Sequence, residues 1–144
     1  MSSGGRGGLR SMTALSPLPE LRLLPFSPAV TDVLGRYIVA CERGEPAAIA
    51  ALLTDDVRLT TPGERRELAG PGPVSELLGG DGELLGVPTW ADGRPAMAVY
   101  VLDQGSGEHL PLGLDVLRVD GDRISLIETY SPERFPELGL PLTR

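Results

Sequence analysis

The second half of the chain consists of apolar segments that are separated by short turns rich in glycine and aspartate. Four such segments cover residues 84–91, 95–102, 110–119 and 123–130, and "ADGRP", "DQGSGEH" and "DGD" connect them. Turns of this composition join antiparallel strands in hairpins. The pattern therefore predicts a meander of four long antiparallel strands, and this restricts the fold to one built on a large sheet.

The first half of the chain has helical periodicity instead. Apolar residues recur at helical spacing in 30–43, "VTDVLGRYIVACER", where Thr31 or Asp32 is a candidate N-cap and Gly44 a stop. We expect a second short helix at 45–53, a strand at 57–61 and a third short helix at 74–78. Helices followed by a meander are typical of an α+β fold. The helices are predicted to close the concave side of a curved, mainly antiparallel sheet, which makes a cone with an apolar interior suited to a ligand.

Length and composition narrow the class of protein. The chain has 144 residues, and 41% of them are hydrophobic, enough for one domain with one core. We expect residues 1–28, rich in Gly, Ser and Pro, to form a flexible arm and residues 29–144 to form the domain. No apolar segment is long enough for a membrane span. The formal charge of −7 argues against a nucleic-acid surface.

The cysteine and arginine content leads to expectations about the cellular compartment and the source genome. Cys41 is the only cysteine, so no internal disulfide can form, and the expected compartment is the cytoplasm. All 13 basic residues are arginine, which we interpret as the codon bias of a GC-rich, actinobacterial genome. No His, Cys, Asp or Glu residues have the spacing of metal ligands. We expect neither a metal nor another cofactor.

Two stretches carry a resemblance to a known family. "RYIVACERGEPAAIAALLTDDVRLTTP" is similar to the opening of SnoaL-like domains, which are part of the nuclear-transport-factor-2-like (NTF2-like) group. "VPTWADGRPAMAVYVLD" and "LDVLRVDGDRISLIETYSPERFPELGLP" resemble the SnoaL-like domain at the C-terminus of certain extracytoplasmic-function sigma factors. The resemblance covers about residues 30–142. It implies the conical fold, and we expect a stand-alone domain without sigma-factor regions.

The same resemblance suggests catalytic residues. In ketosteroid isomerase, which has this fold, a tyrosine and a neutral aspartic acid donate hydrogen bonds to a substrate carbonyl, and another carboxylate moves the proton. The tyrosine position falls on Tyr37 and the acid on Asp115, whereas the base position, next to a proline, holds Thr61. Burial among apolar neighbours should raise the pKa of Asp115. A threonine cannot be a general base unaided, so His109, the only histidine, is the candidate for the missing base.

Each of these three candidates has a simpler alternative. Tyr37 can be a core residue, Asp115 an exposed acid on the solvent side of the sheet, and His109 a solvated turn residue. Other residues are expected to contact substrate or to leave the pocket. The predicted substrate-binding residues are Thr61, Trp90, Met97, Ile127 and Thr129. Glu128 has the opposite strand parity and is predicted to pair with an arginine outside the pocket, and Phe135 and Leu138 to pack over one end of the barrel.

The function that we expect is that of a small, cofactor-independent cyclase or isomerase of polyketide biosynthesis. It would polarise a carbonyl of a hydrophobic intermediate and promote ring closure. A pericyclic or conjugate ring closure, such as a cycloaddition, fits the missing base better than an isomerisation that moves a proton. The alternative is a non-catalytic ligand-binding or regulatory module related to the sigma-linked domains. An epoxide hydrolase is less favoured, because Thr129 occupies the place of a late-strand acid in those enzymes. The resemblance also implies a homodimer.

Overall fold

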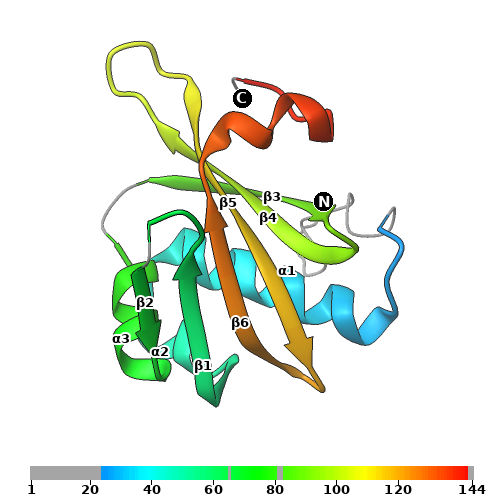
Figure 1. The fold of residues 1–144 in the computed structure, drawn as a ribbon. Coiled ribbons are helices and arrows are strands. Elements are labelled where there is room, and N and C mark those ends of the chain that lie inside the picture. Colours follow the sequence, from blue (N-terminus) through cyan, green and yellow to red (C-terminus); the bar gives the residue numbers. More distant parts are fainter. Residues whose placement is uncertain (1–23, 65, 81–82, 143–144) are drawn as a thin grey trace, which may run out of the picture.

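The protein folds into one curved sheet with helices on one side (Figure 1). The computed structural model describes residues 24–64, 66–80 and 83–142. The elements are α1 (Pro28–Arg43), α2 (Pro46–Ala50), β1 (Leu53–Thr61), β2 (Arg66–Ala69), α3 (Pro71–Leu78), β3 (Leu84–Ala91), β4 (Arg94–Leu102), β5 (His109–Asp120), β6 (Arg123–Tyr130) and the 3₁₀ turns η3 (Pro132–Arg134) and η4 (Pro136–Leu138). The six strands lie in the order β2-β1-β6-β5-β4-β3. Strand β1 is parallel to β6, and all other pairs are antiparallel. The predicted α+β cone is confirmed.

Helix α1 begins earlier than the sequence pattern suggested. Ser27 is the N-cap, and its hydroxyl accepts a hydrogen bond from the Val30 amide at 3.3 Å. Pro28 occupies the first helical position, where its fixed φ suits a helix and its missing N–H costs nothing. The predicted cap at Thr31 or Asp32 is therefore wrong, since both lie inside the first turns. Gly44 ends the helix in the left-handed conformation, as predicted.

The strands of the meander match their predicted ranges within one residue, but the region between the helices does not. The second helix ends at Ala50, and β1 starts at Leu53 instead of Val57. The short edge strand β2 is absent from the sequence-based prediction, because its four residues, "RELA", carry two charges and show no apolar alternation. It pairs with the end of β1 and extends the sheet on that side.

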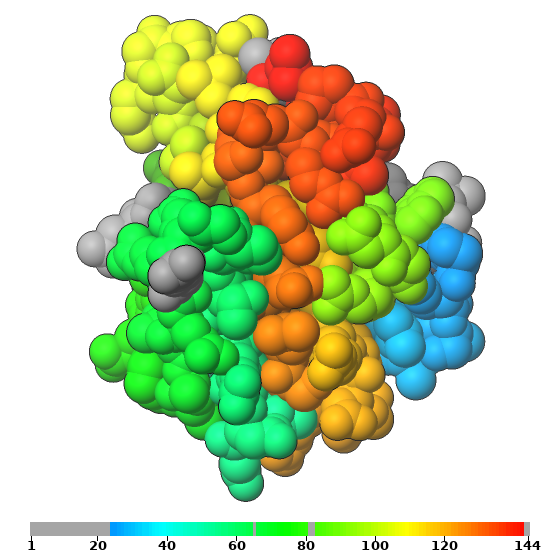
Figure 2. Space-filling view, in the orientation of Figure 1, coloured from blue at the N-terminus to red at the C-terminus, as the bar shows by residue number. Residues whose placement is uncertain are grey.

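The sheet separates two hydrophobic clusters. On the inner face, which the helices cover, the side chains of α1 and α2 pack against residues of β1, β4, β5 and β6. On the outer face, Tyr100, Leu114 and Val116 pack around Phe135 from the C-terminal segment. Figure 2 shows this segment, orange to red, against the sheet beside the β3–β4 turn. Phe135 thus packs on the outer face, and part of the surface that the predicted homodimer would use is covered by the chain itself; the homodimer stays a prediction.

A β-bulge near the start of β5 changes which face its side chains occupy. Val99 of β4 pairs with Gly113, but the next residue, Tyr100, pairs with Pro111, so Leu112 has no partner in the ladder. One extra residue reverses the alternation of side chains on the two sides of a bulge. Residues before Leu112 therefore face opposite to where an ideal strand would put them.

None of the helices in the described part of the chain is long and apolar enough to cross a membrane.

Candidate functional site

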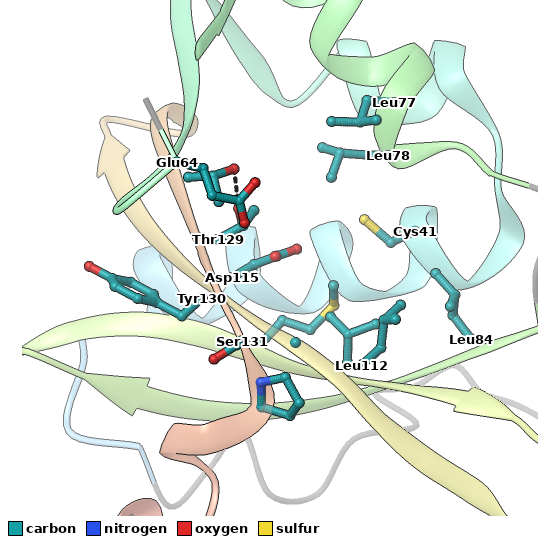
Figure 3. A pocket seen from close by; sticks show the side chains of 15 residues that line it. Cys41, Glu64, Leu77, Leu78, Leu84, Leu112, Asp115, Thr129, Tyr130 and Ser131 are labelled. Carbon is teal, nitrogen blue, oxygen red and sulfur yellow. Dashed lines mark hydrogen bonds between the residues drawn. The ribbon is translucent and has the colours of Figure 1, made fainter. Parts of the chain in front are cut away.

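A cavity of about 450 Å³ lies on the inner face, between the sheet and the helices. Its lining comes from α1, α3, the end of β1 with the following turn, and strands β3 to β6. The volume falls in the range of roughly 300–1,000 Å³ that is usual for small-molecule sites. Figure 3 shows the side chains that line it.

Asp115 of β5 is the buried acid of this cavity. It pairs with Met97 of β4 and Thr129 of β6, and the side chains of all three line the cavity. Only 7% of its surface is exposed. The simpler alternative, an exposed acid on the outer face, is therefore excluded.

Tyr37 lies behind Asp115 and not beside it. Helix α1 turns the phenol toward the sheet, where its hydroxyl donates to Oδ2 of Asp115 at 2.9 Å. The tyrosine is fully buried and is not among the residues that line the cavity. The other oxygen of the carboxyl group, Oδ1, has no hydrogen-bond partner among the described residues. It is therefore available to a ligand in the cavity.

The protonation of this pair follows from burial. Loss of solvent raises the pKa of Asp115 to about 6, and the hydrogen bond from Tyr37 opposes part of that rise because it favours the carboxylate. The predicted upward direction of the pKa is thus confirmed. Burial, with the charge of Asp115 nearby, raises the pKa of Tyr37 well above 10, so the phenol stays a donor. Burial likewise raises the pKa of Cys41, one turn along α1, to about 12.

Two threonine hydroxyls stand next to the acid. Thr61, at the end of β1, and Thr129 are 2.9 Å apart through their Oγ1 atoms, and either can be the donor. Thr129 also donates to the carbonyl oxygen of Thr60 at 3.3 Å. When the Thr129 hydroxyl donates to the Thr60 carbonyl, the Thr61 hydroxyl is the donor in the bond to Thr129. If the Thr61 hydroxyl rotates away from Thr129, it can direct its proton into the cavity. The residue at the expected base position is therefore a potential donor.

Glu64 also lines the cavity, although the sequence analysis did not select it. The amide of Glu64 donates to the carbonyl of Thr61 at 3.0 Å, which closes a tight turn, and Gly63 has a φ of 92° there. "TPGE" is the signature of such a turn, with proline followed by a glycine of positive φ. That signal shows that the chain folds back after Thr61, so a carboxylate three residues later can return to the same cavity.

His109 is not brought to this site. It pairs with Leu102, whereas Asp115 pairs with Met97, and these two β4 residues point to opposite faces. The bulge at Leu112 is the reason, because it reverses the parity that His109 and Asp115 would share on an ideal strand. The histidine starts β5 and does not line the cavity. Its predicted catalytic role would need a contact that this placement does not provide.

The other predicted substrate-binding residues divide into two groups. Met97 lines the cavity together with the two threonines. Ile127 is fully buried in the inner cluster, where it packs as core. Trp90 lies near the far end of β3 from the cavity and is 46% exposed. Neither of these two lines the cavity.

Glu128 leaves the pocket, as predicted. It makes an ion pair with Arg94 on the outer face, where both side chains are partly buried. Nearby, Arg134 pairs with Asp92 at 3.1 Å and lies 4.9 Å from the ring centre of Tyr130. In the described ranges no group of three or more His, Cys, Asp or Glu side chains is placed to hold a metal ion.

Comparisons with known proteins identify the fold. No protein-family model and no curated protein matches this sequence. Among solved structures, a "putative ketosteroid isomerase" from Kribbella flavida is 24% identical, with a TM-score of 0.58 over 73% of this chain and 78% of that one. A protein with a cystatin-like fold from Silicibacter pomeroyi is 22% identical, with a TM-score of 0.55 over 68% and 72%. A de novo designed protein with a curved β-sheet is 19% identical, with a TM-score of 0.59 over 78% and 93%.

These likenesses establish an NTF2-like fold and no more, since every identity is below 25%. One of them is a de novo designed protein, so a match of this kind concerns the fold and not a natural function. The finer resemblance to the sigma-linked SnoaL-like branch stays a prediction.

Proposed function

We propose that this protein is a cofactor-independent isomerase or cyclase of an apolar carbonyl compound, of the polyketide type, and that Asp115 carries the proton. The observation that supports the proposal is a buried carboxyl with a pKa of about 6, one oxygen of which is free toward an apolar cavity. A proton carrier works best when its pKa lies near the working pH. The similarity to a "putative ketosteroid isomerase" agrees with this reaction class.

The isomerisation needs two proton transfers, one from the substrate to Asp115 and one from Asp115 back to the substrate. Ionised Asp115 takes a proton from the carbon next to the substrate carbonyl, and the C–H electron pair moves into an enolate. Protonated Asp115 then returns the same proton to the far carbon of the neighbouring double bond, which shifts into conjugation. In a ring closure, the enolate carbon instead attacks a second carbonyl of the same molecule, and the proton goes to the new alkoxide. The hydroxyl of Thr61, rotated toward the cavity, stabilises the enolate oxygen.

The pKa supports one of the two roles open to Asp115. A neutral acid that donates to the carbonyl, as the resemblance implies, requires a pKa well above the working pH. At about 6, the carboxyl is mostly ionised at pH 7. The base that Thr61 cannot supply is then Asp115 itself, and a cycloaddition is no longer needed to explain its absence.

The pH dependence of the wild-type rate tests the proposal. With a β,γ-unsaturated ketone such as cyclohex-3-enone, or a β,γ-unsaturated 3-ketosteroid, we expect conjugated product to form faster as the pH rises, with an inflection near 6. Formation of the conjugated ketone is followed by ultraviolet absorbance. A rate that falls above pH 6 would assign the neutral-donor role instead. Binding without product at any pH, for these probes and for polyketide-type diketones, would favour the alternative of a ligand-binding module.

The substitution Tyr37→Phe tests whether Tyr37 acts by setting the pKa of Asp115, which itself transfers the proton. Removal of the phenol hydroxyl removes the interaction that lowers the pKa of Asp115, so the inflection in the pH–rate profile should move to higher pH. The ring remains, and the inner cluster keeps its packing. A variant that loses rate equally at every pH, without a shift, would show that Tyr37 acts in some other way.

A further inference from the structure

The cavity is polar at one end and apolar at the other. In Figure 3, Asp115, Glu64 and Thr129 lie together on one side, whereas Cys41 and four leucines lie on the other. We call these four leucines the leucine mouth: Leu77, Leu78, Leu84 and Leu112. A ligand that satisfies both ends has a polar group at one end only.

The leucine mouth is open to solvent at two of its members. Leu77 is 58% exposed and Leu112 is 53% exposed, although both line the cavity. They account for two of the five large hydrophobic side chains that are exposed in the described residues. Single exposed leucines are ordinary, whereas apolar side chains that gather around one opening form the kind of exposed patch that marks a ligand-binding groove.

The local structure fixes these side chains on both sides of the opening. Helix α3 carries Leu77 and Leu78, and Leu84 begins β3. Leu112 is the extra residue of the β5 bulge, and bulges are known to redirect a side chain in this way. Its neighbour Gly113 has no room for a side chain, because a Cβ there would lie 2.9 Å from the Tyr130 carbonyl oxygen. The bulge therefore depends on a glycine at position 113.

The charges around the cavity restrict the polar end of the ligand. Among the described residues that line it there is no arginine, lysine or histidine, whereas Asp115 and Glu64 are there. A carboxylate or phosphate head would meet like charge from Asp115 and Glu64, and no described cation lines the cavity to offset it. A neutral carbonyl head fits, since the Thr61 hydroxyl can donate to it.

From these observations we infer that the ligand is a neutral carbonyl compound with a hydrocarbon tail, and that the tail leaves through the leucine mouth. The inference rests on the proposed function for the place of the carbonyl next to Asp115. It narrows the substrate to a chain whose far end is hydrocarbon, which matches the leucine side chains that the tail would pass.

A series of methyl ketones tests the inference by binding alone. Pentan-2-one to undecan-2-one share one head and differ only in tail length, and an NMR titration of the full-length protein gives each Kd. Transfer of a methylene from water to an apolar site should tighten binding up to about fourfold per carbon. Leu112→Ser and Leu77→Ser should each weaken the longest ketone by about tenfold and the shortest by less than twofold.

Leu110→Ser is the matched control. Leu110 lies on the same strand and is also exposed, but it does not line the cavity, so its variant should bind every ketone like the wild type. Affinity that does not depend on tail length, or an equal loss in all three variants, would overturn the inference and leave the role of Asp115 untouched. A normal tail-length series in a protein with no turnover would contradict only the proposed function.

Discussion

Replacement of Asp115 by Asn is expected to lower the rate of conjugated-ketone formation by roughly 10²–10⁴-fold, the usual contribution of a positioned acid–base group. The amide cannot take the proton from carbon. Its oxygen can still accept the hydrogen bond from Tyr37, and the shape of the side chain is unchanged. Binding of the methyl ketones should therefore persist while turnover is lost. A variant that keeps its rate would remove Asp115 from the mechanism.

The same substitution should make the protein more stable above pH 6. The carboxyl has a pKa of about 6 in the folded protein and an ordinary value of 3.8 when it is solvated. Between these values the folded state binds more protons than the unfolded state, so the free energy of unfolding decreases as the pH rises from about 4 to about 6. A shift of this size corresponds to about 3 kcal/mol, which is lost at neutral pH. Asn does not titrate, and the variant avoids that loss.

The measurement is urea unfolding of both proteins between pH 4 and 8. The difference in unfolding free energy, variant minus wild type, should grow by about 3 kcal/mol over this range and level off above pH 6. Other titrating groups cancel in the difference. Asp103→Asn is the control, because Ser106 lowers the pKa of that exposed carboxyl and its effect has the opposite sign. A difference that stays constant with pH would show that Asp115 is solvated.

Opposite effects on rate and stability are typical of a group kept for function. The inner face would be more stable with an apolar residue at position 115, next to Met97. A buried carboxylate that costs stability at neutral pH is the residue that a proton-transfer reaction needs. Its partner Tyr37 reduces this cost and, through the same hydrogen bond, sets the working pKa.

The sequence was sufficient to predict the sheet and part of the acid's surroundings, namely Thr61, Met97 and Thr129. Long apolar segments between Gly- and Asp-rich turns specify hairpins, and strand alternation places Asp115 on one face with Thr129 opposite it. It was not sufficient for His109, because one unpaired residue reverses the alternation and a bulge has only weak sequence marks, here proline and glycine on either side of Leu112. The sequence also could not predict how the side chains of Tyr37 and Asp115 lie relative to each other. Whether two donors lie side by side or one behind the other depends on how α1 sits on the sheet.

The other prediction with a large expected effect concerns stability and involves Phe135 on the outer face of the sheet. This side chain is fully buried, and its ring lies 5.2 Å from that of Tyr100 in an edge-on arrangement. The Tyr100 hydroxyl donates to the Pro141 carbonyl at 2.6 Å, which holds the C-terminal segment on the same cluster. Phe135→Ala leaves a cavity there and should lower the free energy of unfolding by about 3–5 kcal/mol.

Guanidinium unfolding followed by circular dichroism measures this loss, with Leu142→Ala as the control. Leu142 lies in the same segment but is 60% exposed, so its removal should change stability by less than about 0.5 kcal/mol. Because Phe135 packs on the face of the sheet opposite to Asp115, Phe135→Ala should still bind the methyl ketones where it remains folded. A loss below about 1 kcal/mol would mean that Phe135 adds little to the stability of the outer cluster.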